Sequence, residues 1–191
     1  MIKREDIIEG DLAHFDSFVV PYCKGKWDIV RKLKENGFEP KVIAEIGVRT
    51  ATAALMFMRC WPEAQYIGMD TGGFIDGGIG QIGIEWARKI LKPYNAEIRM
   101  IDSQALTGLV DKLDFAHCDG DHSFKGCTHD MNILFGALNP GGFLLVDDYD
   151  HLSEVRRAVD AWLTARPSLE WKYFKTYRGD ILISKKDQVN G

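Results

Sequence analysis

The sequence lacks any segment that would hold the protein in a membrane. It contains no run of roughly eighteen or more apolar residues, the length needed to cross a bilayer. The first residues, Met-Ile-Lys-Arg-Glu-Asp, are charged and are followed by no apolar stretch of the kind that forms a secretory signal. We therefore expect neither a membrane span nor a secretion signal, and we expect the protein to work in the cytoplasm.

Cysteines are few and carry no recognisable signature. The four cysteines form no Cys-x-x-Cys pair and match no zinc-binding spacing, so we expect reduced thiols, as in a cytoplasmic protein. A net charge of −4 argues against a large nucleic-acid-binding surface. The 191 residues, of which 46% are hydrophobic, suit one globular domain. Length and composition leave open whether the protein forms a homo-oligomer.

The segment Lys41–Met58 reads as strand, turn and helix, but it lacks both common nucleotide-binding signatures. An apolar strand runs into Glu45, turns at Gly47 and continues as a helix rich in alanine, leucine and methionine. Neither Gly-x-Gly-x-x-Gly nor the Gly-Lys-Ser/Thr of a phosphate loop is present, which disfavours a nicotinamide-dependent oxidoreductase and an ATP-binding protein. The amino terminus of the expected helix still favours a negative ligand group such as a carboxylate.

What the sequence does contain is a cluster of acids in the stretch Leu113–Tyr149. Two short apolar runs each end in carboxylates, and a helix-length segment separates them, which predicts two parallel strands joined by a crossover. Ligands of open α/β sheets bind outside the carboxyl ends of the strands, so we expect these acids to face one site. The acids are Asp119, Asp121, Asp147 and Asp148.

Several ionised carboxylates in one pocket need compensation. Two unit charges about 4 Å apart repel by roughly 4 kcal/mol at an effective dielectric near 20. A cation, bound protons or strong donors must offset this repulsion, and a set of carboxylates suits a hard ion such as Mg²⁺. Because neighbouring strand residues point to opposite faces, Asp147 and Asp148 can hold one ion only if the strand ends there.

The remaining chain continues the alternation of strands and helices. Further strands are expected at Gln65–Asp70 and Ala96–Ser103, each ending in a polar pair or an acid, and a closing hairpin at 171–184. Residues 71–83 are rich in glycine, which predicts either a mobile loop beside the site or a plain surface connection. Helical spacing predicts helices at Lys26–Asn36, Ile84–Leu91 and Gln104–Val110. It also predicts a crossover helix that carries Met131, Leu134, Phe135 and Leu138, and a helix marked by Val155, Val159, Trp162 and Leu163 that ends near Pro167.

These motifs together resemble class I S-adenosylmethionine-dependent methyltransferases over about Lys41–Ser184. The resemblance rests on polar residues at the strand ends, namely Glu45-x-Gly47, Asp70, Asp102-Ser103, Asp119 and Asp147. More narrowly, Asp-Gly-Asp-His-Ser, Pro-Gly-Gly and Asp-Asp-Tyr together look like the bacterial macrocin-type sugar O-methyltransferases. The resemblance implies a Rossmann-like methyltransferase fold: a mostly parallel seven-stranded sheet with helices on both faces, an antiparallel hairpin, a helical segment over 1–40 and a core over 41–184.

The resemblance also implies roles for particular residues. Glu45 and Gly47 would line the methionine end of S-adenosylmethionine, Asp70 would hold the ribose hydroxyls, and Asp102 with Ser103 would lie near the adenine. The full set expected at the cofactor is Glu45, Gly47, Val48, Thr50, Asp70, Thr71, Asp102, Ser103 and Asp119. A Mg²⁺ ion would be held by Asp119, Asp147 and Asp148, and the acid at Asp121 would be the base.

The chemistry suits methylation of a small hydroxylated acceptor, such as a sugar or a phenol. Such a hydroxyl is a poor nucleophile at neutral pH, and coordination to a metal would lower its pKa. Asp121 or His122 could then take the proton, and the imidazole has the more suitable intrinsic pKa. Two alternatives stay open: a metal-independent N- or O-methyltransferase, favoured if Asp147 and Asp148 diverge, and a non-catalytic binding module.

The sequence departs from the family pattern at one position. The last glycine of Glu-x-Gly-x-x-x-Gly is replaced by Ala51. We expect the alanine methyl group to lie where the helix approaches the cofactor.

Overall fold

The computed structural model describes residues 19–73 and 78–186. Residues 1–18 of the predicted amino-terminal helical segment, and residues 74–77 of the predicted glycine-rich loop, therefore lie outside the described residues. Among the described residues, no helix has both the length and the apolar character required to cross a bilayer.

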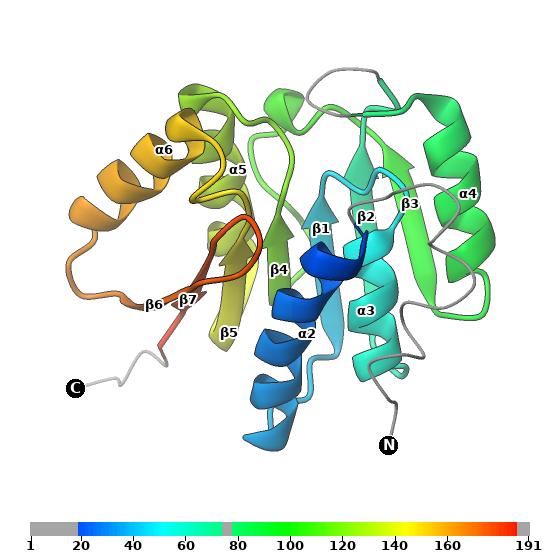
Figure 1. Cartoon of the computed structure of the whole chain (residues 1–191), viewed down its shortest axis with the longest axis horizontal. Coiled ribbons are helices and arrows are strands. Elements are labelled where there is room, and N and C mark those ends of the chain that lie inside the picture. The colour runs from blue at the N-terminus through cyan, green and yellow to red at the C-terminus, as the bar shows by residue number, and fades with distance from the viewer. Residues whose placement is uncertain (1–18, 74–77, 187–191) are drawn as a thin grey trace.

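The described chain forms a seven-stranded sheet in the order β3-β2-β1-β4-β5-β7-β6 (Figure 1). Only the pairs made by β7 are antiparallel, since β7 lies between β5 and β6 and runs against both. This confirms the predicted mostly parallel sheet and its carboxy-terminal hairpin. The strands are β1 (Val42–Ile46), β2 (Gln65–Asp70), β3 (Ala96–Met100), β4 (Leu113–Cys118), β5 (Leu138–Val146), β6 (Glu170–Phe174) and β7 (Asp180–Ser184).

Helices cover both faces of the sheet and give it two hydrophobic cores. One core is shared with α2 (Val19–Glu35), α3 (Thr52–Cys60) and α4 (Gln81–Leu91), and the other with α5 (Phe124–Ala137) and α6 (Ser153–Thr164). Successive strand residues enter different cores: Ile43 lies in the first, and Ala44 lies in the second. Burial on both faces explains why the central strands are nearly continuous apolar runs.

The end of α2 follows the predicted glycine signal. Gly37 adopts φ 85°, its N–H donates to the Lys34 carbonyl, and the Phe38 N–H donates to the Leu33 carbonyl. This pair of hydrogen bonds is a Schellman motif, which ends the helix and satisfies its last carbonyls. Phe38 then packs edge-on against Trp61, so the motif also fixes α2 against the first core.

One predicted helix is not formed. The segment Gln104–Val110 contains only the end of a 3₁₀ turn, η1 (Ser103–Ala105), and it runs on without helix to β4. The Asp102 carboxylate accepts the Gln104 N–H and caps this turn, and Leu106 leaves it in an extended conformation. The Thr107-Gly108 pair has low helix propensity, so nothing local favours a longer helix there.

Candidate functional site

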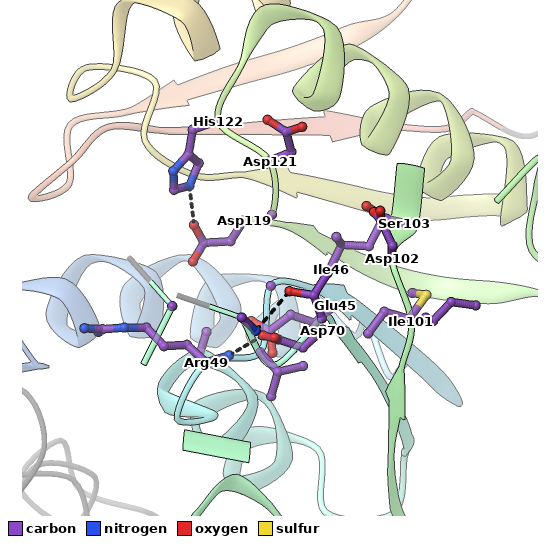
Figure 2. A pocket seen from close by; sticks show the side chains of 18 of the residues that line it. Glu45, Ile46, Arg49, Asp70, Ile101, Asp102, Ser103, Asp119, Asp121 and His122 are labelled. Atoms are coloured by element: carbon purple, nitrogen blue, oxygen red, sulfur yellow. Dashed lines mark hydrogen bonds and ion pairs between the residues drawn. The ribbon is translucent and has the colours of Figure 1, made fainter. Parts of the chain in front are cut away.

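A pocket of about 350 Å³ opens at the carboxyl ends of the central parallel strands. Its walls come from the loops that follow β1, β2, β3 and β4, together with Arg178 from the loop before β7. Figure 2 shows the labelled side chains that converge there from these loops. The pocket thus lies where an open α/β sheet binds its ligands, and all nine residues predicted at the cofactor line it.

Gly47 lies where the turn after β1 meets the loop after β4. Its backbone has φ 90°, and its N–H donates to the Met69 carbonyl over 2.9 Å. A Cβ atom at this position would lie 1.8 Å from the Asp119 carbonyl oxygen. Only glycine allows this approach, so the turn after β1 can contact the loop after β4.

Ala51 occupies a glycine-like conformation but does not enter the pocket. It precedes α3 with φ 60°, a left-handed conformation that costs a residue with a side chain about 1–2 kcal/mol. The residue is fully buried in the first hydrophobic core and is not among the residues that line the pocket. The prediction that the alanine methyl group lies beside the cofactor is therefore wrong. Alanine at this position strains the backbone and does not narrow the pocket.

Asp70 at the end of β2 is held by two backbone donors. One carboxylate oxygen accepts the Arg49 N–H at 2.9 Å, and the other accepts the Gly72 N–H at 2.7 Å. The acid therefore ties the turn after β1 to the loop after β2, and it lies at the pocket beside Thr71. Val48 and Thr50 line the same side.

Asp102 and Ser103, predicted to lie near the adenine, belong to a loop that is held by a buried carboxylate on α5. Asp130 accepts a hydrogen bond from the Gln104 side chain at 2.9 Å and one from the Asp121 N–H at 3.3 Å. Burial raises the Asp130 pKa to about 6, although hydrogen bonds from the Ser103 side chain and the Asp121 N–H oppose this effect. Asp130 thereby links the loop after β3 to the loop after β4.

Glu45 lines the pocket, but its carboxylate is also used inside the protein. His117 lies with Nδ1 2.7 Å from one oxygen, and the Tyr66 hydroxyl donates to the other. Burial raises the Glu45 pKa although both partners oppose this effect. The His117 pKa is also raised, because the Glu45 carboxylate outweighs the effect of burial. The group is a buried network in which both histidine and glutamate have partners.

On the other side of the pocket, His122 stands between two predicted metal ligands. Its Nε2 lies 3.5 Å from Asp119 Oδ1 and 3.3 Å from Asp148 Oδ2. Figure 2 shows the His122 ring directed at the Asp119 carboxylate. Asp148, with φ 61°, is also paired with Arg178, whose guanidinium lies 3.2 Å from its carboxylate.

Asp147 and Asp148 face different cations. Asp147 Oδ1 lies 2.7 Å from the Lys26 ammonium, which is also 2.6 Å from Asp180 Oδ1. Two groups of three side chains among the described residues are close enough to share an ion. One contains His117, Asp119 and Asp147, and the other contains Asp119, His122 and Asp148. The three aspartates predicted to share one ion therefore do not form one group.

Asp121 turns away from this cluster. Its carboxylate accepts the Ser123 N–H at 2.8 Å, and a Cβ atom on Gly126 would lie 2.0 Å from its carboxylate carbon. The side chain is thus packed against the first turn of α5, and Figure 2 shows it apart from the His122 and Asp119 pair. Of the two bases predicted, His122 is the one that contacts the acids at the strand ends.

Burial and neighbouring charges shift the pKa values of the acids in this cluster in opposite directions. Burial opposes ionisation of Asp119, but the nearby His122, His117 and Lys26 lower its pKa to about 2. Burial raises the Asp147 pKa to about 7, and the neighbouring Asp119 and Asp180 add to this effect although Lys26 opposes it. Burial likewise raises the Asp148 pKa. The pocket therefore keeps Asp119 ionised, while its deeper acids hold protons more readily.

Sequence reasoning missed three buried polar residues of the site. Lys26, Asp130 and His117 were given no role, yet each lies among apolar neighbours of its own element. Lys26 shares the helical face of Ile29, Val30 and Leu33, and Asp130 shares the face of Cys127, Met131 and Leu134. A charged residue on an apolar face is the signal that could have found the first two.

Comparisons with known proteins agree with this arrangement. The family model described as a methyltransferase domain matches residues 44–149. No curated protein sequence matches the chain.

Solved structures match the fold at low identity. An O-methyltransferase from Bacillus cereus in complex with SAH is similar with a TM-score of 0.69 at 15% identity, covering 95% of this chain and 90% of that one. The O-methyltransferase TomG from Streptomyces achromogenes, in complex with SAM, has a TM-score of 0.65 at 14% identity, covering 98% of this chain and 100% of that one. An SAH-bound methyltransferase from Podospora anserina has a TM-score of 0.63 at 17% identity, covering 86% of this chain and 79% of that one.

Proposed function

Because the chain belongs to the methyltransferase-domain family, we propose that this S-adenosylmethionine-dependent enzyme methylates a hydroxyl group of a small molecule. The observation that carries the proposal is the pocket with two unlike sides. One side, formed by the loops after β1, β2 and β3, presents backbone turns and the Asp70 carboxylate. The other side presents the His122 imidazole between the carboxylates of Asp119 and Asp148. The solved structures that are similar include O-methyltransferases bound to SAH or SAM, which supports the choice of an oxygen acceptor.

We assign the cofactor to the side formed by the loops after β1, β2 and β3. The Asp70 carboxylate would bind the ribose hydroxyls, and Asp102 with Ser103 would lie near the adenine. The turn at Gly47 and the amino terminus of α3 would face the methionine carboxylate, since helix amino termini favour negative groups. When bound, S-adenosylmethionine supplies a methyl group on a sulfonium sulfur, which leaves as a neutral thioether.

His122 is the base in this proposal. It lines the pocket beside Asp119, and the ring would take the proton of the acceptor hydroxyl as the oxygen becomes methylated. The ionised Asp119 carboxylate would orient the ring and stabilise the imidazolium that forms. Asp121, the base implied by the resemblance, is the alternative, but its carboxylate is bound to the Ser123 N–H.

The residues present do not fit the predicted magnesium site. Mg²⁺ requires near-ideal octahedral oxygen ligands, and the three aspartates predicted to hold it do not form one group. Lys26 already lies 2.7 Å from Asp147. A doubly charged ion about 4 Å from this ammonium would be repelled by roughly 8 kcal/mol at an effective dielectric near 20. This arrangement favours the metal-independent alternative, and no step of the proposed reaction uses a metal.

Calorimetric titration and a methyl-transfer assay test the function. We expect S-adenosylmethionine and its demethylated product to bind to the purified chain, and we expect methyl transfer to one member of a panel of sugars and phenols. His122→Asn should abolish transfer and leave cofactor binding unchanged, whereas Asp121→Asn should retain most of the transfer. If the cofactor binds and no acceptor in a broad hydroxyl panel is methylated, the non-catalytic binding module is the better account.

We propose a single methyltransferase domain over residues 1–191 and a cytoplasmic location, with neither nucleic acid nor membrane as a partner. Light scattering of the purified chain will show whether it forms a homo-oligomer.

A further inference from the structure

The acids at the ends of β4 and β5 and at the start of β7 each lie beside a nitrogen-bearing side chain of the protein. Asp147 and Asp180 share the Lys26 ammonium, Asp148 faces the Arg178 guanidinium and the His122 imidazole, and Asp119 faces His122. These partners come from α2, from the loop after β4 and from the loop before β7. The acids are therefore paired with residues that are far apart in the sequence.

Lys26 is the most deeply placed of these partners. Its side chain is 1% exposed, and its ammonium lies 2.7 Å from Asp147 and 2.6 Å from Asp180. Asp180 has a second donor in the Thr176 hydroxyl, and Asp147 also accepts the Asp148 N–H at 2.8 Å. Both carboxylates are thus held by several donors, which fixes the ammonium between them.

The helix that carries Lys26 is itself anchored. Trp27, Ile29 and Val30 are buried in the first hydrophobic core, and the Schellman motif at Gly37 ends the helix against that core. The packing of α2 therefore holds the backbone of Lys26 beside the sheet, and the 1% exposed side chain places its ammonium inside the protein between the two acids.

We propose that the Lys26 ammonium is the resident cation of this site and that the enzyme works without a divalent metal. The inference rests on the proposed methyltransferase function and deepens it. Lys26 holds Asp147 away from Asp148, so the two acids cannot converge on one ion. Lys26 is not among the residues that line the pocket, so it is a positioning residue.

Binding of Mn²⁺, measured by electron paramagnetic resonance, tests this assignment independently of methyl transfer. We expect the wild-type chain, freed of metal with a chelator, to show no saturable Mn²⁺ site up to millimolar concentrations. Saturable binding of one Mn²⁺ per wild-type chain, abolished by Asp147→Asn or by Asp148→Asn, would overturn the proposal. This arm requires no variant of Lys26 to fold.

A variant sharpens the test. Lys26→Met removes the charge and keeps the apolar stem, so Asp147 and Asp180 are left without their cation. We expect the variant to bind Mn²⁺ at least about tenfold more tightly than the wild type, since two uncompensated carboxylates remain. Lys32→Met, at an exposed position of the same helix, is the matched control and should leave Mn²⁺ binding unchanged. Equal Mn²⁺ affinity of a folded Lys26→Met and the control would contradict the assignment.

Methyl transfer and cofactor binding complete the design. We expect a chelator to leave the wild-type rate of methyl transfer and the affinity for S-adenosylmethionine unchanged. If methyl transfer stops on chelation and returns with Mg²⁺, the assignment of Lys26 as the resident cation is refuted, while the proposed methyltransferase function is supported. An absence of cofactor binding in every condition would refute the proposed function, whereas the Mn²⁺ result would still decide the role of Lys26.

Discussion

The two sides of the pocket are built from different chemistry. On the side of β1, β2 and β3, Asp70 and Asp102 accept hydrogen bonds from backbone N–H groups and stay partly open to the pocket. On the side of β4, β5 and β7, Asp147, Asp148 and Asp180 are buried and paired with side-chain cations. The carboxylates of the first side can still accept hydrogen bonds from a ligand, whereas the buried carboxylates of the second side are already paired within the protein.

The difference shows why acids at strand ends cannot all be interpreted alike. A carboxylate held by neutral backbone donors keeps its negative charge available to a ligand, such as a ribose hydroxyl. A carboxylate paired with a buried ammonium has little left to offer, because breaking a buried pair is strongly destabilising. Two residues, Gly47 and Asp130, join the sides, and substitutions there should affect both.

The largest effect is expected from Gly47→Ala. The added methyl group would meet the Asp119 carbonyl 1.8 Å away, and the backbone has φ 90°, so the two sides would be forced apart. We expect the free energy of unfolding to fall by about 3 kcal/mol or more and cofactor binding to be lost. Urea denaturation and calorimetry measure these quantities. Gly136→Ala, with open space around it in α5, is the control and should be neutral or stabilising.

Asp130→Asn tests the second link between the sides. The folded-state pKa of Asp130 is raised to about 6 from the ordinary 3.8, so its stabilising contribution is complete below pH 3.8 and is lost as pH rises through 6. We expect the wild type to lose roughly 3 kcal/mol by this route between these pH values. The variant should lack this component of the pH dependence.

Urea denaturation at several pH values measures that component. The exposed Glu63→Gln should keep the wild-type profile. An unchanged profile in Asp130→Asn would show that this carboxylate does not titrate as inferred.

Asp70→Asn should act on the cofactor side alone. The substitution removes a charged acceptor of hydrogen bonds, which we expect to cost about 1.5–3 kcal/mol of binding, or roughly ten- to a hundredfold in affinity for S-adenosylmethionine. Calorimetric titration measures this loss. Asp111→Asn, which breaks a pair with Arg99 outside the pocket, should leave the affinity unchanged. Equal affinities of the two variants would remove Asp70 from the cofactor site.

The smallest effect is expected from Arg178→Lys on the other side. The lysine keeps a positive charge near Asp148 but lacks the planar donors of the guanidinium. We expect the free energy of unfolding to change by less than about 1 kcal/mol and the affinity for S-adenosylmethionine to stay the same. A loss of cofactor affinity as large as that of Asp70→Asn would contradict the division of the pocket into two sides.

Most of the fold could be predicted because its signals are local. The Gly47 turn, the Gly37 helix end and the hairpin before Ser184 each follow from a few neighbouring residues. The helix expected at Gln104–Val110 failed because the side chain of Asp102 caps a single turn and the residues after it have weak helix propensity. Residues predicted at the cofactor do line the pocket, and their roles stay predictions.

The sequence by itself determined which residues end the strands, because alternation of apolar runs and helix-length segments places the acids at one edge of the sheet. Only the tertiary structure decided which charge each acid meets. Lys26 and Asp180 are 154 residues apart, and the neighbouring acids Asp147 and Asp148 pair with different cations, Lys26 and Arg178. Charge compensation acts through space over a few ångströms, and no local pattern reveals which distant cation the fold will bring there.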